Sequence, residues 1–106
     1  MKMTIAATEK GEEMTIVERA IEVYGKDAQL NVAIEEFSEL IKEICKSKRG
    51  SDNRDNIIEE MADCYIMLEQ LGLIFGVERE ELYTKVIEKL NRLENRLAER
   101  SENGKS

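Results

Sequence analysis

Apolar side chains recur every three or four residues along most of the chain, which is the period of a helix with one buried face. Four such segments cover residues 15–24, 27–48, 52–75 and 78–100. Gly25 and Gly76 follow the first and third segments, as glycines often do where helices end. No segment alternates like a strand. Short connections place successive helices antiparallel, so the sequence predicts an all-α fold built as a four-helix antiparallel bundle-like unit.

The predicted helical domain covers residues 14–100, between flexible polar tails at 1–13 and 101–106. With 106 residues in all, the chain has the length of one domain with a modest core. Asp27 is a suitable N-cap for the second helix, and Asp52 or Asn53 for the third. These polar side chains mark the expected helix starts.

The predicted helices differ in how far apolar residues extend around them. The second has one apolar face: Leu30, Ala33, Ile34, Phe37, Leu40, Ile41 and Ile44. The fourth has a coiled-coil-like seam: Tyr83, Val86, Leu90, Leu93 and Leu97. The third is apolar over most of its circumference, which is typical of a helix buried on several sides. Four helices of this size cover such a helix incompletely, so we expect a homo-oligomer, either a dimer or a tetramer. A compact monomer with the third helix at its centre is the alternative.

Composition narrows the class of protein. Apolar residues make up 42% of the chain and charged residues 37%, and proline is absent, as expected for a soluble helical domain. The net charge of −7 argues against binding to a nucleic-acid backbone. No apolar run is long enough to span a membrane, and the first residues do not resemble a signal peptide. Cys45 and Cys64 lie in apolar stretches, and we expect buried, reduced thiols in a cytoplasmic protein.

Two acidic pairs break the apolar pattern. Glu36 and Glu39 lie one turn apart on the second helix, at the border of its apolar face. Glu60 and Asp63 have the same spacing within the apolar third helix, and no Lys or Arg lies three or four residues from Asp63. Like charges at this spacing destabilise a helix by a few tenths of a kcal/mol per pair. A carboxylate among apolar residues needs a partner.

The two pairs are separated by enough chain to finish one helix, turn and return. They can therefore face each other across an antiparallel helix pair. Four carboxylates there form an all-oxygen site suited to Mg²⁺ or Mn²⁺. The chain has no histidine, which excludes a histidine-based zinc site and a di-iron site of the Glu-x-x-His type. The ordinary alternative is a solvated acidic face, which is what most acidic clusters are.

The residues Glu35-Glu36-x-x-Glu39, a spacer, and Glu60-x-x-Asp63 resemble the signature of the all-α nucleoside triphosphate pyrophosphohydrolases. This superfamily includes the MazG-like enzymes, the dimeric all-α dUTPases and the dCTP pyrophosphatases. Residues 29–36 and Lys48-Arg49-Gly50 are similar to the shorter MazG-like proteins of bacteria and phages. The resemblance covers roughly residues 24–96.

The resemblance implies a helical, oligomeric, Mg²⁺-dependent enzyme that cleaves a (d)NTP between its α- and β-phosphates, giving (d)NMP and pyrophosphate. By position it implies four metal ligands: Glu36, Glu39, Glu60 and Asp63. Glu36 is also the candidate for orienting the attacking water, with Glu35 in support. A bound metal lowers the pKa of water, and a carboxylate can then accept its proton.

The family also places cationic side chains of the last helix against the phosphates. Lys85, Lys89, Arg92 and Arg96 form one basic stripe here, with Lys89 and Arg92 the first candidates. The alternative is that Glu81–Lys85 and Glu88–Arg92 are ordinary pairs that stabilise an exposed helix. Many members of the family carry an aromatic residue shortly before the first acidic motif, a place that Tyr24 can fill, with a core or helix-end role as the alternative. Gln29 is a weaker candidate for contact with the base.

Two other functions stay open. One is a non-catalytic helical interaction or regulatory protein, whose acids would tolerate lysine. The other is a nucleotide binder without turnover. An enzyme requires acids at Glu60 and Asp63 and is stabilised by its metal.

Overall fold

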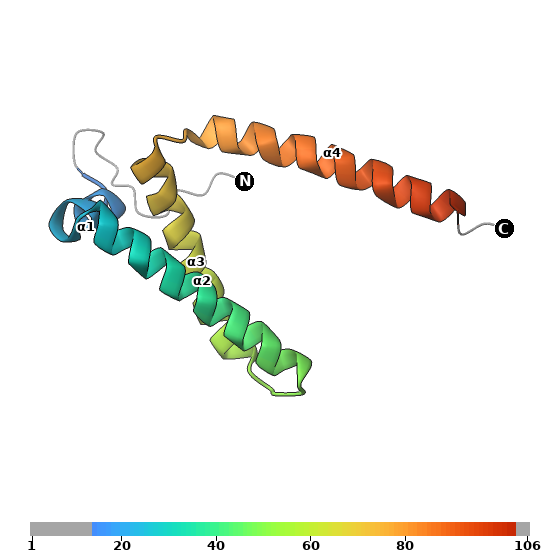
Figure 1. Ribbon diagram of the computed structural model, residues 1–106, viewed down its shortest axis with the longest axis horizontal. Coiled ribbons are helices and arrows are strands. Elements are labelled where there is room, and N and C mark those ends of the chain that lie inside the picture. Colours follow the sequence, from blue (N-terminus) through green and yellow to red (C-terminus); the bar gives the residue numbers. More distant parts are fainter. Residues whose placement is uncertain (1–13, 104–106) are drawn as a thin grey trace. The chain divides into compact units, whose positions relative to one another are not determined.

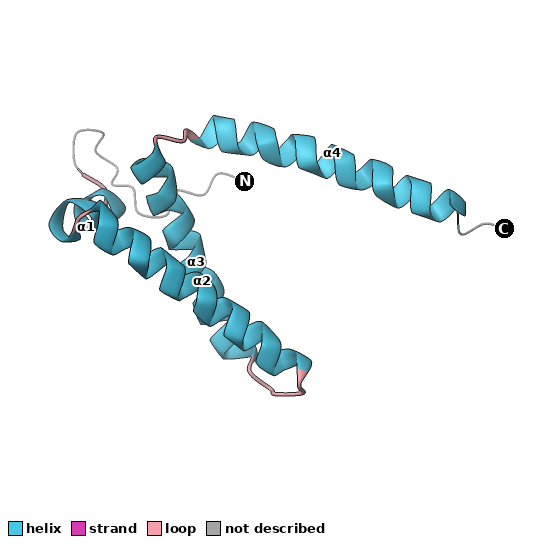
Figure 2. Cartoon of the chain, in the orientation of Figure 1, coloured by secondary structure: helices cyan, strands magenta, loops and turns pink. Residues whose placement is uncertain are grey.

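The computed structural model describes residues 14–103, which form four α-helices and no strand (Figures 1 and 2). The helices are α1 (Ile16–Tyr24), α2 (Lys26–Lys48), α3 (Arg54–Phe75) and α4 (Arg79–Asn103). The prediction of an all-α fold is confirmed. Within 14–103, no helix combines the length and the apolar character that crossing a membrane requires. The predicted N-terminal tail (1–13) and the last three residues of the predicted C-terminal tail lie outside the described residues.

A capping box and one glycine shape the start of the helical region. The Thr15 hydroxyl accepts a hydrogen bond from the Glu18 amide (3.0 Å), and the Glu18 carboxylate accepts one from the Thr15 amide (3.1 Å). Gly25 follows α1 with φ of 91°, and α2 begins at the next residue. The prediction that Asp27 is the N-cap of α2 is therefore wrong, because the positive φ of Gly25 lets α2 start before it. Asp27 lies in the first turn of α2 instead.

The other helix ends lie close to the ends that the sequence predicts. Gly76 adopts the left-handed conformation (φ 67°, ψ 34°) and ends α3 as predicted. Asn53 is the N-cap residue of α3, but its side chain makes no capping hydrogen bond. The reason is that this side chain reaches back to α2. α4 continues to Asn103, three residues beyond the predicted end.

The chain divides into two units, and each is described by itself. In the first unit α1, α2 and α3 contact one another, and α2 and α3 lie side by side and antiparallel (Figure 1). In the second unit α4 is a single helix of 25 residues that carries the predicted leucine seam and basic stripe. The place of α4 in a four-helix unit stays a prediction.

The interior of the first unit is more polar than the sequence pattern predicts. Its buried apolar side chains are Val17, Ala33, Cys64 and Met67, and its buried polar ones are Gln29, Glu43 and Gln70. Ile34 and Ile41 belong to the predicted apolar face of α2, yet they are 66% and 61% exposed. Met61 and Leu68 of α3 are exposed as well. The helix pair thus buries a partly polar stripe and leaves apolar side chains on its surface.

The two cysteines differ. Cys64 is buried and free, as predicted. Cys45 is free but exposed, so the prediction that it is buried is wrong. Cys45 lies on α2 next to Ile44, which is exposed too, so this face of α2 turns away from α3.

Candidate metal centre

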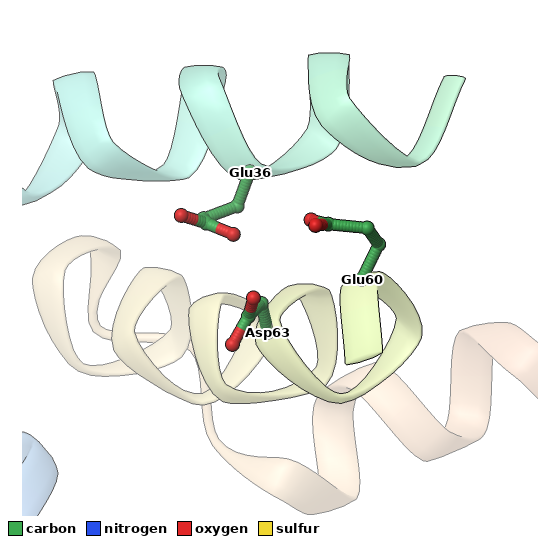
Figure 3. A group of neighbouring side chains, drawn as sticks. All are labelled: Glu36, Glu60 and Asp63. Carbon is green, nitrogen blue, oxygen red and sulfur yellow. The ribbon is translucent and has the colours of Figure 1, made fainter. Parts of the chain in front are cut away.

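The helix pair brings together three of the four predicted ligands. Glu36 comes from α2, and Glu60 and Asp63 come from successive turns of α3 (Figure 3). One carboxylate oxygen from each residue lies within 4.8 Å of the other two. Oxygens bound to one Mg²⁺ or Ca²⁺ at about 2.1–2.6 Å are up to about 4–5 Å apart. The three carboxylates have the spacing of ligands around a single divalent cation.

A contact beside the carboxylates holds the two helices at this level. The buried Cys64 thiol donates a hydrogen bond to the main-chain carbonyl of Glu36, with 3.4 Å between sulfur and oxygen. Cys64 directly follows Asp63, so this contact places the turn of α2 that carries Glu36 opposite the turn of α3 that carries Asp63. The i, i+3 spacing then brings Glu60 to the same side as Asp63.

The three carboxylates repel one another in a partly dry setting. Burial raises the pKa of Glu36 most, followed by its hydrogen bond with Asp63 and by the charges of Asp63 and Glu60. Burial also raises the pKa of Glu60, and the charge of Asp63 adds to this. Within the described residues, the Glu60 Oε2 atom is buried and has no hydrogen-bond partner. This oxygen is therefore unsatisfied among residues 14–103.

A divalent cation fits this donor set. All three ligands are carboxylate oxygens, which Mg²⁺, Mn²⁺ and Ca²⁺ prefer. A buried acceptor without a partner is unfavourable, and within residues 14–103 Glu60 Oε2 is such an acceptor. Glu36, Glu60 and Asp63 are the residues that would hold the ion.

The other two predicted acids lie at the edge of this group. Glu39 is exposed and is not among the three clustered carboxylates. Its charge nevertheless raises the pKa of both Glu36 and Glu60, so it lies close to them. Glu35 is exposed, and its main-chain carbonyl accepts a hydrogen bond from the Ser38 hydroxyl (2.7 Å).

Glu43 is a buried acid that belongs to neither predicted acidic pair. It is only 6% exposed. The Asn53 side-chain amide donates to its carbonyl (2.9 Å) and to its carboxylate (2.8 Å), and Lys46 Nζ lies 3.2 Å from the carboxylate. The hydrogen bond from Asn53 lowers the pKa of Glu43 most, and Lys46 lowers it further against the opposing effect of burial. These contacts close the turn between α2 and α3.

A signal for Glu43 was present in the sequence. Glu43 lies seven residues after Glu36, so the two side chains are about 20° apart around the helix axis. Glu39 is about 60° from Glu36 by the same measure. Glu43 is thus the better match to the stripe that faces α3. Its charge also raises the pKa of Glu60, which places it beside the three clustered carboxylates.

The predicted phosphate-binding residues lie on α4. Lys85 Nζ pairs with the Glu88 carboxylate at 2.8 Å, and both side chains are exposed. The pair raises the pKa of Lys85 and lowers that of Glu88, to which the charges of Arg92 and Lys89 also contribute. Glu81 accepts a hydrogen bond from the Glu78 amide at the start of the helix (3.1 Å). The role of the stripe toward a phosphate stays a prediction.

Comparison with known proteins gives no match: no family model fits the chain, and no curated protein or solved structure is found to be similar. The resemblance to the pyrophosphohydrolases thus rests on the two acidic motifs and their flanking residues. It stays a prediction.

The raised pKa of Glu60 predicts how stability changes with pH when no metal is bound. A carboxyl whose pKa is raised by folding stabilises the fold below its ordinary value of 4.5, and this stabilisation is lost as the pH rises through the folded pKa. In EDTA we expect Glu60→Gln to raise the Tm above that of the parent at about pH 7, and the difference to shrink toward about pH 4. Thermal melts across this range provide the test.

Two variants serve as controls for this prediction. Glu22→Gln changes an exposed acid of α1, away from the cluster, and should shift the Tm little. Glu43→Gln should have the opposite effect, a lower Tm at neutral pH, because the lowered pKa of Glu43 gives stability that is present above 4.5 and lost as the pH falls through the folded pKa. Parallel curves for Glu60→Gln and the parent would contradict the repulsion described above.

Proposed function

We propose that this chain is a Mg²⁺-dependent nucleoside triphosphate pyrophosphohydrolase that converts a (d)NTP and water to a (d)NMP and pyrophosphate. The observation that carries the proposal is the meeting of Glu36, Glu60 and Asp63, three mutually repelling carboxylates with an unpartnered buried oxygen among them. The two motifs that supply these residues are those in which the sequence resembles the all-α pyrophosphohydrolases. An acidic protein can bind an acidic triphosphate when a metal lies between them.

Glu36, Glu60 and Asp63 hold the cation in this proposal, and Glu39 at their edge is the fourth candidate ligand. The metal supplies charge neutralisation at the phosphates and a lower pKa for bound water. The acids must therefore be ionised and held in place before substrate arrives. The thiol contact of Cys64 and the Asn53–Glu43 contacts hold the two helices that carry them.

Glu36 is also the proposed general base. Its carboxylate has two oxygens, so one can bind the cation while the other accepts a proton. It accepts a proton from the attacking water, whose oxygen bonds to phosphorus as the α–β anhydride bond breaks. Glu35, which is adjacent and exposed, supports this role by its negative charge.

Lys89 and Arg92 of α4 are the proposed partners of the phosphates. Lys85 is the weaker candidate, because its ammonium group is already paired with Glu88. Cationic groups near the β- and γ-phosphates stabilise the negative charge of the pyrophosphate that leaves.

We further propose that the protein works as a homo-oligomer of four-helix units, in the cytoplasm. Apolar side chains such as Ile34, Ile41, Met61 and Leu68 are exposed in the described chain, and a large exposed apolar surface is unusual for a monomer. The same observation favours the second candidate function, a non-catalytic helical interaction protein. The two candidate functions differ in whether the acids catalyse a reaction.

The proposed reaction predicts release of pyrophosphate and a nucleoside monophosphate when the protein is given Mg²⁺ and a panel of canonical and modified NTPs and dNTPs. Glu36→Ala should lower the rate at least about a hundredfold, because it removes a metal ligand and the proton acceptor together. Ser38→Ala, an exposed change two residues away, is the control and should keep the parental rate. No release on any substrate, with Mn²⁺ tried as well, would favour the interaction protein or a nucleotide binder.

The assignment of Lys89 predicts a change in substrate binding without a matching loss of stability. Lys89→Ala should raise the KM for the triphosphate about tenfold, since a charge-assisted hydrogen bond to phosphate contributes about 1.5–3 kcal/mol, and should leave the Tm nearly unchanged. Lys26→Ala removes an exposed lysine of α2 and provides the matched control. An unchanged KM would leave the stripe on α4 as an ordinary solvated face.

A further inference from the structure

Gln70 carries a second buried oxygen without a partner. The residue lies on α3 and is 4% exposed. Within the described part of the chain, no group donates a hydrogen bond to its Oε1 atom, which is buried. An amide oxygen in this state costs about 1–3 kcal/mol relative to a bonded one. A donor from outside the chain would remove that penalty.

The position of Gln70 relates it to the acidic group. Gln70 lies seven residues after Asp63 on α3, and Gln29 lies seven residues before Glu36 on α2. Because α2 and α3 are antiparallel, the two glutamines come to the same level of the helix pair, on the stripes that carry the carboxylates. Seven residues correspond to about 10 Å along a helix. The chain has only these two glutamines, and both are buried.

The stripe between the acids and the amides is apolar and uncharged. Ala33 of α2 and Met67 of α3 lie between the two levels, and both are buried. A ligand held at both levels therefore needs a charged end at the acids, an uncharged body, and a hydrogen-bond donor at the far end. A nucleotide has these parts in this order, and its length from phosphate to base edge is comparable to the separation of the levels.

We propose that Gln70 binds the nucleobase of the substrate, its Oε1 accepting a hydrogen bond from an N–H group on the edge of the base. The proposal rests on the proposed function and adds the part of the site that recognises the nucleoside. Gln29, at the same level, is the second amide next to the base. A planar base with N–H donors suits this position better than a ribose, because the neighbouring Met67 is apolar. Gln70 and Met67 are both buried in the free chain, so side chains must shift for the base to enter.

Calorimetric titration with α,β-methylene nucleoside triphosphates tests the proposal, because these analogues bind but cannot be cleaved at the α–β position. Inorganic tripolyphosphate, which lacks a base, is titrated in parallel with Mg²⁺ present. Gln70→Met should weaken binding of the preferred analogue about tenfold, as expected for one lost hydrogen bond. It should leave tripolyphosphate binding unchanged, and it should not lower the Tm of the free protein, because it removes an unsatisfied polar atom.

Leu73→Met changes an exposed apolar residue of α3 without altering a polar atom, and should keep both affinities. A second measurement uses the unaltered protein: an analogue of the preferred triphosphate whose base N–H groups are methylated should bind about tenfold more weakly. Parental affinity of Gln70→Met for every nucleotide would overturn the proposal. So would an equal loss of nucleotide and tripolyphosphate binding together with a lower Tm, which would give Gln70 a purely structural role.

The two proposals fail in different ways. Gln70-dependent binding of nucleotides without pyrophosphate release would overturn the proposed reaction and support the base contact. If Gln70→Met releases pyrophosphate with the same base preference as the parent, the result would support the proposed reaction and overturn the base contact. Absence of binding by any analogue or by tripolyphosphate would overturn both.

Discussion

The register of α2 against α3 decides which acids of this chain meet. The Cys64 thiol contacts the Glu36 carbonyl, and at the turn Asn53 donates to both the carbonyl and the carboxylate of Glu43. A shift of one residue along either helix would rotate it by about 100° and separate the carboxylates. The acidic group, the polar stripe and the position of Gln70 all follow from this one alignment.

The alignment is unfavourable for the metal-free chain. Three carboxylates held within 4.8 Å repel one another, and burial and this repulsion raise the pKa of Glu36 and Glu60. Well-packed apolar residues at these positions would give a more stable helix pair. The simplest reason for such an arrangement is that a bound ligand stabilises it. A divalent cation matches the charge and the oxygen donors of the three carboxylates.

The sequence predicts the helices and the three acids that meet, Glu36 on α2 and Glu60 and Asp63 on α3, because both depend on local rules. Helical periodicity and the glycines set the elements, and the i, i+3 spacing sets the stripe of Glu60 and Asp63. The rotation of one helix about its axis depends instead on tertiary contacts. Glu39 therefore lies at the edge while Glu43 is buried, although both follow Glu36 on α2.

The exposure of the isoleucines of α2 also depends on tertiary contacts, which set the rotation of the helix. Ile34 and Ile41 satisfy the helical pattern as well as Ala33 does, so periodicity alone assigns all three to one face. In the folded unit Ala33 is buried, whereas the two isoleucines face outward. The oxygens of Glu60 and Gln70 that have no partner among residues 14–103 are likewise properties of the helix pair, and neither sequence motif reveals them.

Thermal melting with and without Mg²⁺ tests most directly whether the three carboxylates form a cation site. The parent protein is compared with the double variant Glu60→Gln, Asp63→Asn, both first freed of metal with EDTA. A cation at a hundred times its Kd adds about 2.7 kcal/mol to the free energy of unfolding, so millimolar Mg²⁺ should raise the Tm of the parent by several degrees and leave that of the double variant unchanged. An equal response of the two proteins to Mg²⁺, or no response of the parent, would contradict the account.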